Sequence, residues 1–320
     1  MAVRIRNLLL SKEGGIFLVL IMLQILAILF VDNYTDPNNI KLLLKATPSL
    51  GILALSATVL MISGEFDLSM GSTFALAPMI SALCHGAGLN LWLCIMIALM
   101  IGASVGLANG LIKVWTVMPS FIVTIATMMF WRGITLFIAG ARWVKFKTEG
   151  IAQFLFADTI GWLPLQFIWF AGITLILWCL LNRMRFGNWI FATGGNVKAA
   201  KAMGINTDFV KVTCFIIAGI LAAVAGLFES LRVTSVGPMQ GGQILIFTAI
   251  AAMVIGGTKI GGGVGTVLGT FIGAIIMFSI QNILMLMRVQ AFLFQLLVGV
   301  ILVSAAAGTL LIRKKANSLE

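Results

Sequence analysis

The sequence predicts an all-α fold, a bundle of about ten apolar helices that crosses a membrane. The 320 residues are 61% hydrophobic and only 10% charged, with a mean hydropathy of +1.12. A soluble domain carries roughly a quarter charged residues, so lipid must solvate part of this surface. The apolar runs are continuous and about twenty residues long, whereas the strands of a membrane β-barrel alternate over about ten residues.

The apolar runs give the expected elements in chain order. We expect a single transmembrane domain over residues 1–320 and place its spans near 15–31, 43–63, 71–85, 90–112, 118–139, 164–181, 209–228, 244–258, 264–286 and 291–311. Several spans are short for a hydrocarbon core about 30 Å thick. Pro78 is expected to interrupt the third span, and Gly256–Gly257 ends the eighth. Short or broken spans are tolerated where neighbouring helices or a water-filled path satisfy the freed backbone.

The lysines and arginines predict the orientation. With the amino terminus in the cytoplasm, ten spans place the carboxy terminus there as well, together with the basic residues at 313–315 and the basic segment 182–212. This distribution follows the positive-inside rule and accounts for the net charge of +11 better than nucleic-acid binding does. The basic loop 140–163 falls outside and is an exception to the rule.

The sequence offers no chemistry for an enzyme. The four cysteines form no CxxC pair, and no His/Asp/Cys constellation or metal-ligand pair occurs. The segment VIGGTKIGGGVGT has the glycines of a phosphate loop, but Lys259 is followed by Ile260 rather than Ser or Thr. We therefore expect a protein that is not an enzyme and that holds no cofactor or nucleotide of its own.

Two acids lie between apolar runs at the depth of the membrane, Glu65 and Asp67 in SGEFDLSMGS. Two interpretations stay open. Asp67 can cap a helix that begins near Leu68, where a carboxylate is favoured. Alternatively, the two acids serve as the coupling site of a proton- or sodium-driven carrier, since such carriers need ionisable groups within the membrane.

The basic segment contains a predicted short helix, ATGGNVKAAKAMGI. Asn196 is a good N-cap, residues 197–203 support two turns, and Gly204 is a good residue to end the helix. Lys198 and Lys201 share one edge, and the other positions are mostly alanine. A small-faced basic helix is typical either of contact with anionic lipid heads or of docking to a cytoplasmic partner.

Four sequence motifs, taken together, resemble those of a known protein family. In order they are SGEFDLSMGS, VMPSFIVTIATMMFWRG, ATGGNVKAAKAMGINTDFVK and VIGGTKIGGGVGTVLGTFIGAII. Together they resemble the permease subunit of the ribose-type (monosaccharide) ABC importers, a family of binding-protein-dependent inner-membrane transport components, over nearly the whole chain. Three features depart from the family pattern: Met118 before the proline, Lys259–Ile260 before the second glycine cluster, and the long basic loop 140–163.

The resemblance implies the partners and the mechanism. Two such membrane subunits, identical or different, would sit in the bacterial cytoplasmic membrane on two ATP-binding subunits, which hold ATP and magnesium. A periplasmic or surface-tethered binding protein would deliver the solute, and alternating access would move it. The segment 182–210 would couple the ATPase to the bundle, with contact residues Gly195, Asn196, Val197, Lys198, Ala199, Ala200, Lys201, Met203 and Gly204.

A sugar path needs hydrogen-bonding groups without strong charge, so that the solute can leave again. The candidates are Ser63, Glu65, Ser69, Asn109, Thr124, Gln240, Gln243, Gln281 and Asn282. Each of them could instead hold two helices together. Ribose-like monosaccharides lead as solutes. Polyols, autoinducer-type furanosyl compounds and nucleosides stay open, as does a branched-chain amino-acid permease of the same superfamily.

Overall fold

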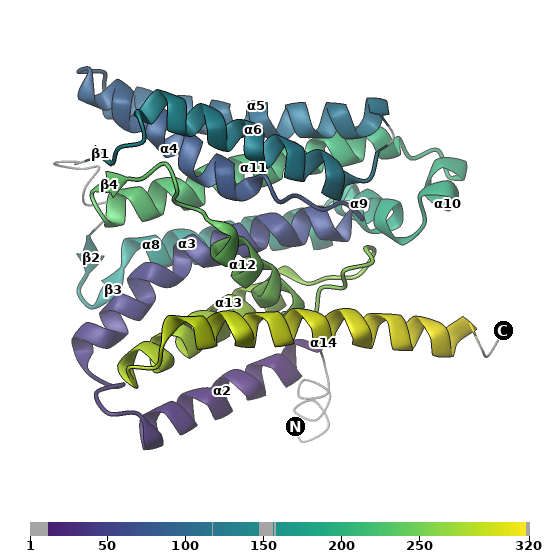
Figure 1. Ribbon diagram of the computed structural model, residues 1–320. Helices are drawn as coiled ribbons and strands as arrows, with labels where there is room; N and C mark the ends of the chain where they lie inside the picture. Colours follow the sequence, from purple (N-terminus) through teal and green to yellow (C-terminus); the bar gives the residue numbers. More distant parts are fainter. Residues whose placement is uncertain (1–11, 117, 147–155, 157, 318–320) are drawn as a thin grey trace.

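The computed structural model describes residues 12–317 apart from 117, 147–155 and 157, and it is a bundle of helices (Figure 1). The helices are α2 (Lys12–Phe30), α3 (Pro37–Ile62), α4 (Met70–Gly86), α5 (Leu91–Thr116), α6 (Ser120–Ala139), α8 (Leu165–Arg183), α9 (Arg185–Gly195), α10 (Val197–Ala202), α11 (Thr207–Arg232), α12 (Gln243–Ile255), α13 (Val267–Leu286) and α14 (Ala291–Asn317). Each predicted apolar run overlaps one of them, so the all-α class is confirmed.

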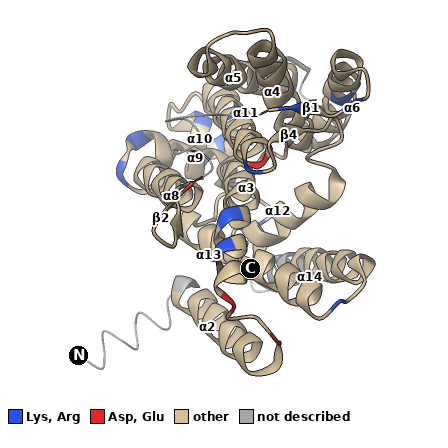
Figure 2. Ribbon diagram, turned by 90° about the vertical axis from the view of Figure 1, so that its left-hand side faces the viewer, with Lys and Arg blue, Asp and Glu red and all other residues tan. Residues whose placement is uncertain are grey.

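The composition of the helices matches a membrane. Among the described residues, six helices are long and apolar enough to cross one, namely α3, α5, α6, α8, α11 and α13. Coloured by charge, the ribbon is almost entirely uncharged (Figure 2). The chain is therefore a multi-pass membrane protein. Parts of the expected charge pattern, including Lys147 and the side chains at 313–315, lie outside the described residues.

Two short antiparallel strand pairs lie at one end of the bundle (Figure 1). Strand β1 (Val144–Lys145) pairs with β4 (Ser235–Val236), and β2 (Thr159–Ile160) pairs with β3 (Leu163–Pro164). The helix α10 lies at the opposite end (Figure 1). These two ends are called the β1 end and the α10 end below.

Helix α3 forms the centre of the core. Every residue from Ala46 to Ile62 is buried, and α3 packs against α8, α11, α12 and α13. Helices α5 and α6 lie on one side of it and α13, α14 and α2 on the other (Figure 1). Glycines allow the closest approaches: a Cβ on Gly106 or Gly219 would overlap the backbone of Phe215 or Gly102, respectively. The small-residue spacing therefore does pack helices together, as membrane bundles require.

One sequence expectation about the helices is wrong. Pro78 does not interrupt the third span, because α4 continues through it to Gly86. Helix α4 is short because it begins late, after a loop over residues 63–69 that we call loop 63–69. Helix α12 is also short, since it begins only after the turn Gly237–Gly242. The first residues of α4, Met70 and Gly71, are buried inside the bundle, whereas the first residues of α12, Gln243 and Ile244, are exposed.

Candidate functional sites

The short helix α10 forms as the sequence predicts. The Asn196 side chain accepts a hydrogen bond from the Ala199 N–H at 3.1 Å, which caps the first turn. Gly204 has a φ of +80°, a left-handed conformation that glycine adopts without strain. The chain then turns directly into α11, whose first N–H groups are capped by Asn206. Two asparagine caps and one glycine thus define a separate helix at the α10 end.

Most of α10 faces away from the rest of the chain. The residues from Gly195 to Ala199 are exposed, as are those from Lys201 to Gly204, and the side chain of Met203 is 82% exposed. Ala200 is different, because it is only 3% exposed. Ala200 is therefore the residue by which α10 packs on its own chain, while the contact with a partner that we predict for it stays a prediction.

Glycine contacts connect this region to two loops of the bundle. A Cβ on Gly194, at the end of α9, would overlap the Ile62 carbonyl and approach the Gly263 nitrogen to 2.8 Å. The Gly263 N–H in turn donates to the Ile62 carbonyl at 2.9 Å. Gly64, with a φ of +84°, lies against Gly194 as well. The backbones of α9, loop 63–69 and the glycine loop after α12 therefore touch without intervening side chains.

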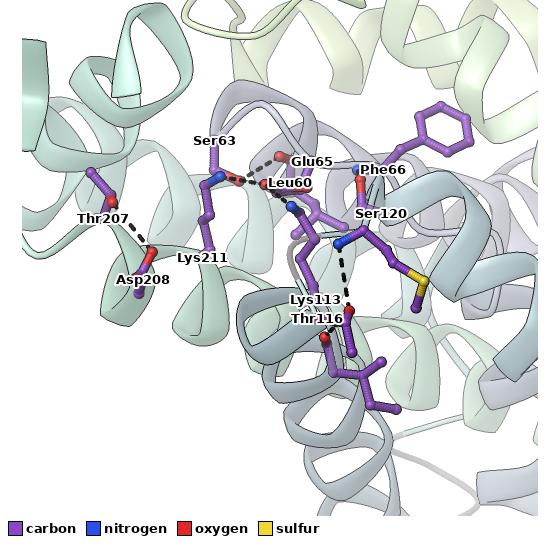
Figure 3. A network of polar contacts seen from close by, with 12 residues as sticks. Leu60, Ser63, Glu65, Phe66, Lys113, Thr116, Ser120, Thr207, Asp208 and Lys211 are labelled. Carbon is purple, nitrogen blue, oxygen red and sulfur yellow. Dashed lines mark hydrogen bonds and ion pairs between the residues drawn. The ribbon is translucent and has the colours of Figure 1, made fainter. Parts of the chain in front are cut away.

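Glu65 ties loop 63–69 to two further helices (Figure 3). Its carboxylate lies 2.6 Å from Lys211 Nζ on α11 and 3.8 Å from Lys113 Nζ on α5. The Glu65 side chain is 4% exposed, and the two lysine side chains are 15% exposed or less. A buried carboxylate needs such compensation, because an unpaired charge in this environment is very costly.

The other polar candidates of this region also hold the loop in place. Asp67 accepts the Ser69 N–H at 2.7 Å, and Asn109 Nδ2 donates to Ser69 Oγ at 2.6 Å. Thr124 Oγ1 donates to the Phe66 carbonyl, and Ser63 Oγ donates to the Leu60 carbonyl.

These contacts place five of the nine path candidates. Residues Ser63, Glu65, Ser69, Asn109 and Thr124 gather around loop 63–69 near the α10 end, and the cavity described next is not lined by them. The helix α4 begins at Met70 with Ser69 as its N-cap residue, two positions later than the predicted start. The Asp67 side chain bonds the N–H of Ser69 just before the helix, so it supports the start of α4 from the loop.

A cavity of about 1050 Å³ lies in the half of the bundle toward the β1 end. It lies among α3, α6, α11, α12, α13 and α14, and most of its wall is apolar, with Leu50, Phe74 and Phe278 among the lining residues. Four path candidates line it: Gln240, Gln243, Gln281 and Asn282. A largely apolar cavity with a few polar groups is the usual form of a small-molecule site.

Two of these four amides are engaged within the chain. Asn282 exchanges hydrogen bonds with Asn39 at 2.8 and 3.1 Å, which joins α13 to α3. Gln240 Oε1 accepts bonds from the Gly237 N–H and from Ser230 Oγ. Gln243 is exposed and Gln281 half-buried at the wall of the cavity. The structure therefore brings together the later candidates, and it separates them from the earlier five.

Three charged residues of the cavity wall were not among the sequence candidates. Glu229 and Arg232, in the last turn of α11, form a two-point ion pair through Oε1–Nη2 at 2.6 Å and Oε2–Nε at 3.1 Å. Ser49 Oγ on α3 also donates to Glu229 Oε2, at 3.0 Å. The only sequence signal was an acid and a base three residues apart at the end of an apolar run.

Arg132 is the third charged residue of the cavity wall. It is the only charged residue of α6, a signal in the sequence that could have drawn attention to it. Its two terminal nitrogens donate to four backbone carbonyls at 2.6–3.0 Å, those of Gly71, Pro238, Gln240 and Gly241. Because Gly71 and Gly241 belong to the starts of α4 and α12, the guanidinium joins these two short helices at the floor of the cavity.

The part of the chain that the structure describes shows no arrangement for metal chemistry. Among those residues, no three His, Cys, Asp or Glu side chains lie close enough to hold a metal ion. Its sites are a cavity among apolar helices, a buried ion-pair cluster and an exposed capped helix. A multi-pass bundle with these features is a membrane transport protein.

Comparison with known proteins identifies the family. The chain matches the family described as "Branched-chain amino acid transport system / permease component" over residues 39–306, and it belongs to that family. It is a transport subunit and not an enzyme.

Relatives in three Yersinia species match most of the chain. It is 30% identical to the autoinducer 2 import system permease protein LsrC of Yersinia enterocolitica over 91% of this chain and 81% of that protein. The corresponding proteins of Yersinia pestis and Yersinia pseudotuberculosis are each 29% identical over 91% of this chain and 83% of theirs. No solved structure matches.

Proposed function

We propose that this chain is the membrane-spanning subunit of an ATP-driven importer that brings a sugar-like solute into a bacterial cell. The observation that carries the proposal is the exposed, capped α10 in a permease family member with no phosphate-binding motif of its own. The ten helices that match the apolar runs all enter the membrane, with both termini in the cytoplasm. The α10 end is then cytoplasmic, and the β1 end faces outward.

ATP and magnesium bind in a separate ATP-binding subunit. That subunit receives α10 through Val197, Ala199 and Met203, whose side chains lie free on the surface of this chain. Lys198 faces acidic groups at the edge of the partner. The glycine contacts of Gly194 support a direct transfer of motion from α10 to loop 63–69, because touching backbones have no side chains that could absorb it.

A second permease subunit covers the open side of the cavity. The cavity is lined by Met129, Met239 and Met285, each of which is more than half exposed. The cavity therefore reaches the molecular surface of the single chain. Charged groups such as Glu229 and Arg232 are costly beside lipid. A protein surface over α6, α12 and α14 removes that cost. The partner is another copy or a related permease.

A sugar-like solute suits the cavity better than an ion does. The relatives are described as permeases for autoinducer 2 import, whereas the family description mentions branched-chain amino acids. Amide groups on an apolar wall can bind hydroxyls and release them again. The ion-driven alternative loses its support, since Glu65 is paired with two lysines and Asp67 binds the start of α4.

Co-purification from the native membrane tests the proposal. An ATP-binding chain and a second permease should accompany this protein, and a solute-binding protein should stimulate ATP hydrolysis by the complex. Recovery of the chain alone, with uptake driven by a proton or sodium gradient, would contradict the proposal.

A further inference from the structure

We propose that the Glu229–Arg232 ion pair, with Ser49, recognises the solute by binding two adjacent hydroxyl groups. The inference rests on the proposed function, because it assigns a role within the same cavity. It goes beyond that function in naming the recognising residues and the chemical feature that they select, a neutral vicinal diol.

The geometry of the Glu229–Arg232 pair fixes both side chains at the cavity wall. Arg232 binds the Glu229 carboxylate through Nε and Nη2, so the guanidinium and the carboxylate lie side by side. Ser49 fixes the carboxylate from α3 by donating to Oε2. Both charged side chains stay partly accessible, at 24% for Arg232 and 23% for Glu229, and both line the cavity. The pair is held rigidly and still faces the space where a solute would lie.

The pair also has hydrogen-bonding positions that a solute could use. Within the described residues, one N–H of Arg232 Nη2 bonds Glu229 Oε1 and the second N–H of Nη2 has no acceptor, while Oε1 accepts only from Arg232. A donor and an acceptor are therefore free next to each other. Two adjacent hydroxyls match this pattern, because one can accept from the guanidinium while the other donates to the carboxylate.

Charge argues for a neutral solute. The pair is neutral as a unit, and the third charged group of the wall, Arg132, has the N–H groups of both terminal nitrogens bound by four carbonyls. An anion would have to compete with Glu229 for Arg232, and a cation would compete with Arg232 for Glu229. Hydroxyls need no such exchange. The amides of Gln243 and Gln281 and the rings of Phe74 and Phe278 complete a wall suited to an uncharged polar molecule.

A zwitterionic amino acid is the competing ligand, since its carboxylate and ammonium could separate the two side chains. That event would break two charge-assisted bonds and the contact of Ser49. The diol is favoured because it leaves these bonds in place. L-leucine therefore serves as the second arm of the test.

The experiment measures uptake into vesicles that contain the complete transporter with its co-purifying partners. The probes are D-ribose, 2-deoxy-D-ribose, which lacks the hydroxyl at position 2 and with it the adjacent pairs at positions 1,2 and 2,3, and L-leucine. The variants are Glu229→Gln, Arg232→Gln and the double variant Glu229→Met/Arg232→Met. The double variant leaves no unpaired charge, and replacing an ion pair by apolar groups of similar size is often neutral for stability. Arg288→Gln, an exposed charge away from the cavity wall, is the matched control.

We expect the unchanged transporter to take up D-ribose with a KM about tenfold or more below that for 2-deoxy-D-ribose, since a site built to bind a hydroxyl rejects an analogue without it. The three cavity variants should lose this difference in KM, and Arg288→Gln should keep it. The double variant should still bind ATP and should melt at an unchanged temperature. An undiminished preference in the double variant overturns the diol site and leaves the importer intact. Uptake of leucine in place of both sugars overturns the site and the sugar assignment together. If no complex with an ATPase forms, the proposed function itself fails.

Discussion

Lys211 Nζ lies 2.6 Å from Glu65 Oε1, and this contact joins the beginning of α11 to loop 63–69 (Figure 3). Lys211 is in the second turn of α11, which begins directly after the turn that follows α10. Lys211 therefore connects the helix that follows α10 to the core of the bundle, and the pair gives the first prediction.

Removing the Glu65 charge should destabilise the protein more than removing either lysine. Glu65→Gln leaves two buried lysines without a counter-charge, and breaking a buried pair costs about 3–5 kcal/mol. Lys113→Met and Lys211→Met each leave one lysine paired with Glu65, so both should cost less. Thermal unfolding in detergent measures the difference. Lys201→Gln, which removes an exposed pair with Asp208, should change stability by less than about 1 kcal/mol. Equal effects for Glu65→Gln and Lys201→Gln would mean that the cluster is not buried.

The position of Gly194 should not accept even a methyl group. In Gly194→Ala the new Cβ overlaps the Ile62 carbonyl, and a backbone shift of that kind costs about 1–3 kcal/mol. We expect a lower melting temperature, and ATP hydrolysis that proceeds without matching uptake. Gly172→Ala is the matched control, because a Cβ there meets nothing within 4 Å and alanine favours the helix. A Gly194→Ala protein that behaves like Gly172→Ala would refute the close contact between α9 and the end of α3.

Arg132 should not be replaceable by lysine. Its guanidinium reaches four carbonyls at once, whereas an ammonium group has three donors and no planar fork. Arg132→Lys leaves at least one carbonyl unpaired, at a cost of about 1–3 kcal/mol, and Arg132→Met leaves all four unpaired and costs more. Thermal unfolding should rank the two variants in that order, with exposed Arg142→Lys as the control. A reversed order, or no effect, would show that α4 and α12 do not depend on the guanidinium.

Local signals in the sequence predicted the local elements well. The caps at Asn196 and Gly204 define α10, because a cap acts within one turn of the helix. The apolar runs predict the longer helices, because burial in lipid depends on composition. Pro78 was misjudged, since α4 continues through the proline, which lies buried within the helix.

The functional groups were harder to predict, because they depend on which helices meet. Gln243 and Gln281 lie 38 residues apart in the sequence and line the same cavity, while Glu65 and Asn109 are held in a separate network near the α10 end. Glu229 and Arg232 had only the signal of a common helical ion pair. Their importance follows from the position of α11 beside α3 and from the contact of Ser49, which no spacing reveals.

The exposed face of α10 provides the most direct test of the central claim, that a separate ATPase drives this permease through the short helix. Ala199→Glu places a charge on that face without touching the core, and Gln290→Glu adds the same charge to an exposed loop at the β1 end. The measurement is co-purification of the ATP-binding chain, together with ATP-dependent uptake by the recovered complex. The account predicts that Ala199→Glu folds with an unchanged melting temperature but loses the ATP-binding chain and the uptake, while Gln290→Glu keeps both. Full retention of the ATPase and of uptake by Ala199→Glu would contradict it.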